Sequence, residues 1–224
     1  MSKLIIANWK SNKSPEAARS WCEHFLQGYS QTQQEVVIAP PLSLLEVVKK
    51  ALATAPSLQL GAQDVSPFAQ GAYTGAVSAD QLFDLGVSTV IVGHSERRRY
   101  FHETSEDVAK KVTQAIQAGL TPIICVDAPY VQEQLTRISP AELEKSVVAY
   151  EPLASIGSGN RADVGSVSAV VAQIRAFSPT SRVLYGGSVD SSSVNEYCIV
   201  TDGVLVGSAS LDAHEFSRLV AAVF

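Results

Sequence analysis

Eight short runs of aliphatic residues recur along the chain and limit its possible folds more than any other feature. They cover residues 4–7, 36–39, 58–62, 89–92, 122–126, 147–150, 182–185 and 204–206. Most are continuously apolar rather than alternating, which is typical of parallel strands covered on both faces. The sequence therefore predicts a parallel sheet that is covered on both faces.

Segments with helical periodicity lie between these runs, for example residues 43–52 and 108–116. Helix-start patterns precede several of them, among them Ser43-x-x-Glu46, Ser78-x-x-Gln81 and Ser139-x-x-Glu142. A strand followed by a helix, repeated eight times, predicts a closed parallel (β/α)₈ barrel. An open, doubly wound sheet is the alternative architecture.

The chain contains no linker-like composition break, so we expect a single domain over residues 1–224. Its apolar content of 46% is that of an ordinary globular protein. No apolar run approaches the ~20 residues that a membrane-spanning helix needs, and the N-terminal apolar stretch is too short for a signal peptide. We therefore expect a cytoplasmic protein without a membrane partner.

Charge and cysteine content exclude further classes. The formal net charge of −5 argues against a nucleic-acid partner, and an anionic substrate would have to be bound by local positive groups. Cys22, Cys125 and Cys198 are odd in number and lack a C-x-x-C pair, so they fit neither a disulfide framework nor a zinc site. We expect reduced thiols and no metal.

Polar groups follow the predicted strands at the end of the barrel where active sites of this fold lie. Lys10, His94 and Glu151 follow the first, fourth and sixth strands, and glycine-serine turns at residues 186–188 and 207–208 follow the last two. Glycine turns before helices let backbone N–H groups approach a phosphate closely. This pattern predicts acid-base chemistry beside an anion site.

Six motifs carry a resemblance to a known family. In chain order they are NWK, QDVSPFAQGAYTG, VGHSERR, AYEP with IGSG, YGGSV and DGVLVGSASL. Together they resemble the triosephosphate isomerase family from one end of the chain to the other. The resemblance implies interconversion of dihydroxyacetone phosphate and D-glyceraldehyde 3-phosphate through an enediolate, in glycolysis and gluconeogenesis, with no metal or organic cofactor.

The same resemblance assigns roles to the reacting groups. It makes Glu151 the general base, because one carboxylate can move a proton between neighbouring carbons. His94, at the start of a short helix, becomes a neutral imidazole that donates to the substrate oxygen. Lys10 neutralises developing charge with support from Glu96, and Asn8 contacts the substrate. Taken singly, each residue could equally be an ordinary ion pair, a structural histidine or a surface lysine.

Phosphate-binding and assembly roles also follow from the resemblance. Four residues match the family's phosphate-binding positions: Gly157, Ser188, Gly207 and Ser208. Cys125 matches a family position but is interpreted as a packing residue. The stretch GAYTG at residues 71–75 resembles the family's interface loop, which implies a homodimer in which Thr74 lies beside Asn8 and Lys10 of the other subunit. A tetramer remains open.

Three departures from the family pattern modify these expectations. Leu153-Ala154-Ser155 replaces a stretch that commonly contains tryptophan, so we expect residues 153–160 to close less faithfully as a lid over the phosphate. The familiar second glycine of the last turn is Ser208. Only 25 residues separate Cys125 from Glu151, which predicts a shortened connection between strands five and six.

Two other functions stay open from the sequence. An aldolase or another phosphate-binding barrel enzyme would share the glycine-serine turns, although many aldolases use a Schiff-base lysine within a strand, and lysine is absent from the predicted strand interiors. A catalytically weakened or non-catalytic phosphate-binding barrel would keep the fold. The presence of Lys10, His94 and Glu151 favours the isomerase.

Overall fold

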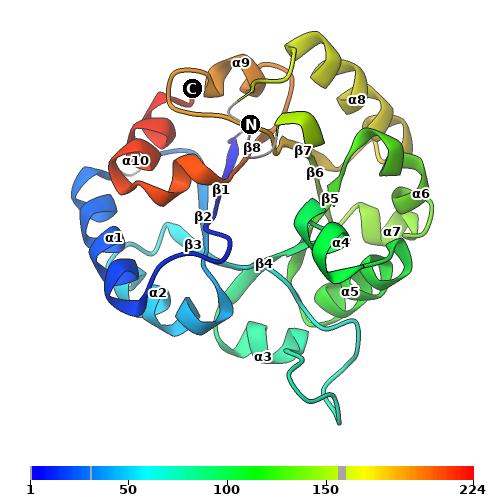
Figure 1. Ribbon diagram of the computed structural model, residues 1–224, viewed down its shortest axis with the longest axis horizontal. Helices are drawn as coiled ribbons and strands as arrows, with labels where there is room; N and C mark the ends of the chain where they lie inside the picture. Colours follow the sequence, from blue (N-terminus) through cyan, green and yellow to red (C-terminus); the bar gives the residue numbers. More distant parts are fainter. Residues whose placement is uncertain (1, 31, 156–159) are drawn as a thin grey trace.

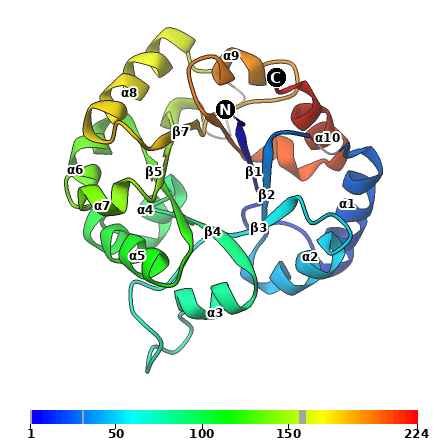
Figure 2. The same ribbon diagram turned by 180° about the vertical axis from the view of Figure 1, so that it is seen from behind.

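Eight parallel strands close into a barrel in the order of the sequence, with β8 beside β1 (Figures 1 and 2). The computed structural model describes residues 2–30, 32–155 and 160–224. The strands are β1 (Leu4–Asn8), β2 (Glu35–Ala39), β3 (Leu58–Ala62), β4 (Val87–Val92), β5 (Thr121–Val126), β6 (Val147–Tyr150), β7 (Arg182–Tyr185) and β8 (Gly203–Val206). The predicted closed (β/α)₈ barrel is confirmed, and the open sheet is excluded.

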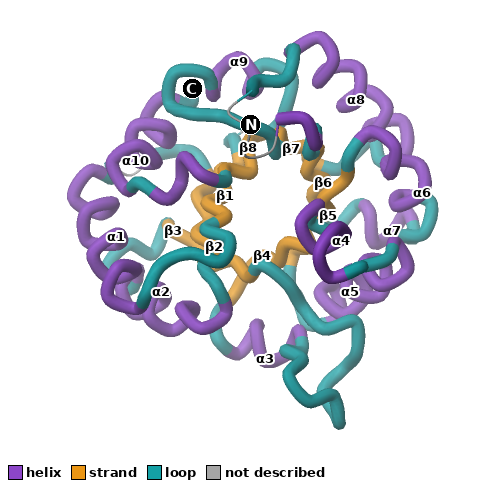
Figure 3. Tube along the Cα trace, in the orientation of Figure 1, coloured by secondary structure: helices purple, strands orange, loops and turns teal. Residues whose placement is uncertain are grey.

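Helices surround the strands on the outside (Figure 3). They are α1 (Pro15–Gly28), α2 (Leu45–Leu52), α3 (Ala79–Asp84), α4 (Ser95–Phe101), α5 (Ser105–Gln117), α6 (Val131–Leu135), α7 (Pro140–Leu143), α8 (Val164–Phe177), α9 (Val194–Cys198) and α10 (Ala213–Ala222). Four short 3₁₀ turns accompany them: η1 (Leu42–Leu44), η2 (Ala128–Tyr130), η3 (Leu153–Ser155) and η4 (Ser208–Leu211). Of the described helices, none is long and apolar enough to cross a membrane.

Local start signals explain where several helices begin. Ser78 and Ser139 form capping boxes at α3 and α7, as the sequence predicts. The predicted helix cap at Ser43 is wrong, because Ser43 lies inside η1 and α2 begins two residues later without a side-chain cap. Between β5 and β6, α6 and α7 have only 5 and 4 residues. The shortened connection is therefore confirmed.

The strands are buried on both faces, which accounts for their continuous apolar sequences. Eleven buried side chains, among them Ile6, Ile91 and Leu205, fill the barrel interior. A larger cluster packs the outer face of the strands against the helices. Gly203 allows the barrel to close, since a Cβ there would lie 1.9 Å from the carbonyl oxygen of Leu4, and its φ is +147°. Only glycine fits that approach.

Candidate active site

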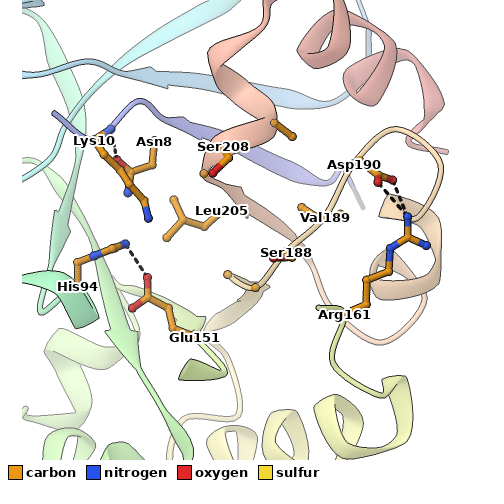
Figure 4. Close-up of a pocket in the computed structure, with 14 residues that line it drawn as sticks. Asn8, Lys10, His94, Glu151, Arg161, Ser188, Val189, Asp190, Leu205 and Ser208 are labelled. Carbon is orange, nitrogen blue, oxygen red and sulfur yellow. Dashed lines mark hydrogen bonds and ion pairs between the residues drawn. The ribbon is translucent and has the colours of Figure 1, made fainter. Parts of the chain in front are cut away.

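A cavity of about 310 Å³ lies at the carboxyl end of the strands (Figure 4). Its described lining is Asn8, Lys10, His94, Glu151, Arg161, Gly186, Gly187, Ser188, Val189, Asp190, Leu205, Gly207, Ser208 and Ala209. The barrel thus brings together side chains from β1, β4, β6, β7 and β8 that are far apart in sequence. The volume suits a small ligand.

Glu151 follows β6 directly and places a buried carboxylate in this cavity. The residue is 1% exposed, and its backbone N–H donates to the carbonyl oxygen of Val126 at 2.7 Å, which fixes the end of the strand. Its Oε1 lies 3.0 Å from His94 Nε2, and its Oε2 accepts the Ser95 backbone N–H at 2.9 Å. Two donors therefore orient the carboxylate toward the cavity (Figure 4).

The hydrogen bonds of His94 define its tautomer. His94 is the N-cap of α4, and its Nδ1 accepts the backbone N–H of Glu96 at 3.2 Å. A ring nitrogen that accepts carries no proton, so the imidazole is neutral and its proton is on Nε2. Nε2 is the atom that faces Glu151. The ring can therefore donate a hydrogen bond through Nε2, at the wall of the cavity.

Lys10 reaches the cavity through an unusual backbone conformation. Its φ is +52°, in the left-handed region, and its backbone N–H donates to Asn8 Oδ1 at 3.0 Å. That conformation costs a residue other than glycine about 1–2 kcal/mol, which the hydrogen bond from the Lys10 N–H to Asn8 partly offsets. The Lys10 ammonium lies 2.6 Å from Glu96 Oε1. Glu96 thus supports the lysine from outside the cavity.

The turns after β7 and β8 form the other end of the cavity. Gly186 and Gly187 bring the backbone close to its neighbours: a Cβ on Gly187 would lie 2.3 Å from the Tyr185 hydroxyl. The Ser188 hydroxyl donates to the carbonyl oxygen of Ser155. Gly207 precedes η4, whose first residue is Ser208. Backbone N–H groups in such turns are suited to an anion.

One predicted site residue and half of the predicted lid, residues 153–160, lie outside the described residues. These are Gly157 and the rest of 156–159. Immediately before them, Leu153–Ser155 form η3, with Leu153 exposed and Ser155 buried.

Arg161 and Asp190 line the cavity although no sequence motif singled them out. Arg161 Nη2 lies 2.9 Å from Asp190 Oδ2 and joins the chain before α8 to the loop between β7 and α9. Hydrogen bonds from the Ser192 and Ser193 hydroxyls and from Arg161 hold the pKa of Asp190 well below its usual range. Nothing in the local sequence signals this pair, because its partners are 29 residues apart.

Cys125 lies beside the base but away from the cavity lining. It belongs to the barrel-interior cluster, and burial, reinforced by the nearby Glu151 carboxylate, raises its thiol pKa well above the usual value. A thiol of that kind is unreactive. The position fits the packing role predicted for it.

The geometry defines what the cavity can do. It contains a buried carboxylate, a neutral imidazole donor and an ammonium at one end, and glycine-serine turns at the other. A carboxylate beside a hydrogen-bond donor and a cation can move a proton next to a carbonyl group while the developing negative charge is stabilised. The turns can hold a phosphate at the same time.

Comparison with known proteins gives one consistent result. The family model described as "Triosephosphate isomerase" matches residues 3–223. A relative of that name from Alkaliphilus oremlandii is 39% identical over 98% of this chain and 99% of its own length. Relatives of the same name from Thermus thermophilus and Chloroflexus aurantiacus are each 38% identical over 97% of both chains.

Proposed function

The chain belongs to the triosephosphate isomerase family and is an aldose-ketose isomerase of triose phosphates, and from this premise we propose which of its residues carry the reaction. The reaction interconverts dihydroxyacetone phosphate and D-glyceraldehyde 3-phosphate by proton transfer through an enediolate. The contact between the Glu151 carboxylate and His94 Nε2 carries the assignment. It places a base and a hydrogen-bond donor side by side in one cavity.

Glu151 is the proposed base. It removes a proton from the carbon next to the substrate carbonyl and returns it to the neighbouring carbon, which requires one carboxylate oxygen to reach both. The carboxylate is almost fully buried, so water competes little for it. When substrate binds, the Nε2–H of His94 exchanges its contact with Glu151 for the substrate oxygen.

His94, Lys10 and Asn8 are the proposed stabilisers of the enediolate. The His94 proton on Nε2 meets the oxygen on which charge develops, and the Lys10 ammonium lowers the energy of a second negative charge beside the phosphate. Asn8 fixes the backbone of Lys10 and lines the same cavity. Glu96 acts as a positioning residue through its ion pair with Lys10.

The phosphate is proposed to bind at the turns after β7 and β8. Ser188, Gly207 and Ser208 all line the cavity, and η4 begins at Ser208. Gly157, outside the described residues, completes this set by the family resemblance. Because backbone N–H groups supply the positive end, the net charge of −5 is compatible with an anionic substrate.

Assembly as a homodimer is a further proposal. A groove of about 580 Å³ adjoins Asn8 and Lys10 and is lined on its apolar side by Leu42, Val65 and Phe101. The segment between β3 and α3, which contains Thr74, extends away from the barrel (Figures 1 and 2). A second copy inserting this segment into the groove would cover exposed apolar side chains and bring Thr74 next to Lys10.

A coupled isomerase assay tests the function. We expect turnover of both triose phosphates without added metal or cofactor and in the presence of a chelator. Failure to exceed a heat-denatured control would contradict the assignment. A Schiff-base aldolase has little support, since none of the eight described strands contains lysine. We also propose a cytoplasmic location, consistent with three buried free cysteines.

A further inference from the structure

A second cavity, of about 400 Å³, lies on the other side of Glu151 from the substrate pocket. We name it the rear cavity and define it by Ser95, Arg98, Asp127, Tyr130, Glu151 and Leu153. Glu151 forms part of the wall of both cavities. Tyr130 and Leu153 are 39% and 56% exposed, so the rear cavity opens to solvent between η2 and η3.

Two buried polar atoms in its wall have no hydrogen-bond partner within the described residues. They are Asp127 Oδ1 and Ser95 Oγ. Asp127 is 8% exposed, and burial raises the pKa of its carboxyl group. A buried carboxylate oxygen without a donor is costly, and native structures nearly always satisfy such atoms with protein, water or ligand. The pair therefore indicates a site for a donor group.

The neighbouring cations do not supply that donor. Arg98 donates through Nε to the Gly93 carbonyl oxygen, through Nη1 to Ser105 Oγ and through Nη2 to Gln134 Oε1. Its guanidinium group lies over the Tyr130 ring, 5.2 Å from the ring centroid. These contacts hold the Arg98 guanidinium group in one orientation, so that it forms a flat and rigid part of the cavity wall.

The charges of the described lining of the rear cavity balance in number, with the cations Lys10, Arg98 and Arg99 and the acids Glu96, Asp127 and Glu151. Lys10 is paired with Glu96, and the Arg99 guanidinium lies over the Tyr100 ring. Burial raises the pKa of Asp127 most, the Arg98 guanidinium lowers that pKa, and the Glu151 carboxylate raises it. A cationic N–H donor would form a charge-assisted hydrogen bond with the free oxygen of Asp127, whereas a carboxylate anion has no donor to offer it.

We propose that the rear cavity binds a small planar cation of the amidine or guanidine class. Its N–H groups donate to Asp127 Oδ1, with Ser95 Oγ as a further polar contact, and its apolar part lies between Tyr130 and Leu153. Through Glu151 the bound cation also regulates turnover, and this part of the inference rests on the proposed function. The bound cation holds the Glu151 carboxylate in place from the rear cavity, while the substrate pocket stays open.

Benzamidine is the probe, and benzamide and benzoate are its neutral and anionic analogues of nearly equal shape. In calorimetric titrations of the full chain we expect benzamidine to bind about tenfold or more tightly than benzamide, and benzoate not to bind. Asp127→Asn should weaken benzamidine by about tenfold or more, because a charge-assisted hydrogen bond is lost. Asp84→Asn, an exposed acid at the end of α3, is the matched control and should leave binding unchanged.

Kinetics supply a second readout. Benzamidine should lower kcat and leave KM for the triose phosphate nearly unchanged. Equal binding of the three probes, unchanged affinity in Asp127→Asn, or competition with substrate would overturn the inference. If Asp127→Asn does not fold, Tyr130→Ala at the cavity mouth serves instead, and unchanged benzamidine affinity there would overturn it. If the protein shows no isomerase turnover but binds benzamidine in a way that depends on Asp127, the binding site in the rear cavity is supported and the proposed function is contradicted.

Discussion

Replacing Glu151 with glutamine removes the proposed base and changes little else in shape. The wild-type carboxylate receives one N–H from His94 and one from Ser95. Glutamine offers a single oxygen, so one of these donors would face an amide NH₂ group. We therefore expect two separable effects, one on turnover and one on stability.

The magnitude of each effect follows from the site. General acid-base catalysis contributes about 10²–10⁴-fold, so kcat should fall by at least that range, equivalent to about 3–5 kcal/mol in the barrier. The unmatched donor next to position 151 should lower the free energy of unfolding by about 1–3 kcal/mol. That loss is small against a typical stability of about 5–15 kcal/mol, so the variant should fold.

The measurement is the coupled isomerase assay together with thermal unfolding followed by circular dichroism. Glu133→Gln, an exposed glutamate on α6, provides the matched control and should change neither quantity appreciably. A Glu151→Gln protein that keeps near-normal kcat would refute the base assignment. A protein that loses turnover only because it unfolds would show this in the circular dichroism.

Three further outcomes are expected. Sedimentation at micromolar concentration should show a dimer, and a fully active monomer would contradict the proposed role of Thr74. Gly203→Ala should lower the melting temperature by about 6 °C or more, because its Cβ would overlap a carbonyl oxygen. Gly86→Ala, also at positive φ but with only ordinary contacts, should lower it by about 2–4 °C, and equal shifts would contradict the packing argument. Burial raises the pKa of the Cys22 thiol to about 12 and raises that of the other two thiols, so iodoacetamide at pH 8 should modify native protein far more slowly than denatured protein; similar rates would refute this.

The barrel could be predicted from the sequence because its signal is local and repeated. Each strand is visible in the sequence as a continuous apolar run, because one face packs in the barrel interior and the other packs against helices. Position in the fold then limits where active groups can lie. For this reason the strand ends alone indicate Lys10, His94 and Glu151, and the structure places all three around one cavity.

Features that depend on partners distant in sequence could not be predicted. The Arg161–Asp190 pair and the unsatisfied Asp127 oxygen arise from how loops meet at the barrel rim. Ser43 is the opposite case: the local sequence carries a capping pattern, but the residue lies inside a 3₁₀ turn and does not cap a helix. The tautomer of His94 likewise required the position of a backbone N–H.

The left-handed backbone at Lys10 has a consequence for engineering and evolution. A glycine would adopt this φ without steric strain, so selection for thermal tolerance alone would favour glycine there and discard the ammonium beside Glu96. At residue 10, stability therefore favours glycine and activity favours lysine. A library of variants selected for melting temperature should accumulate glycine at residue 10 and yield folded but inactive proteins. A library selected for isomerase activity should retain the strained lysine.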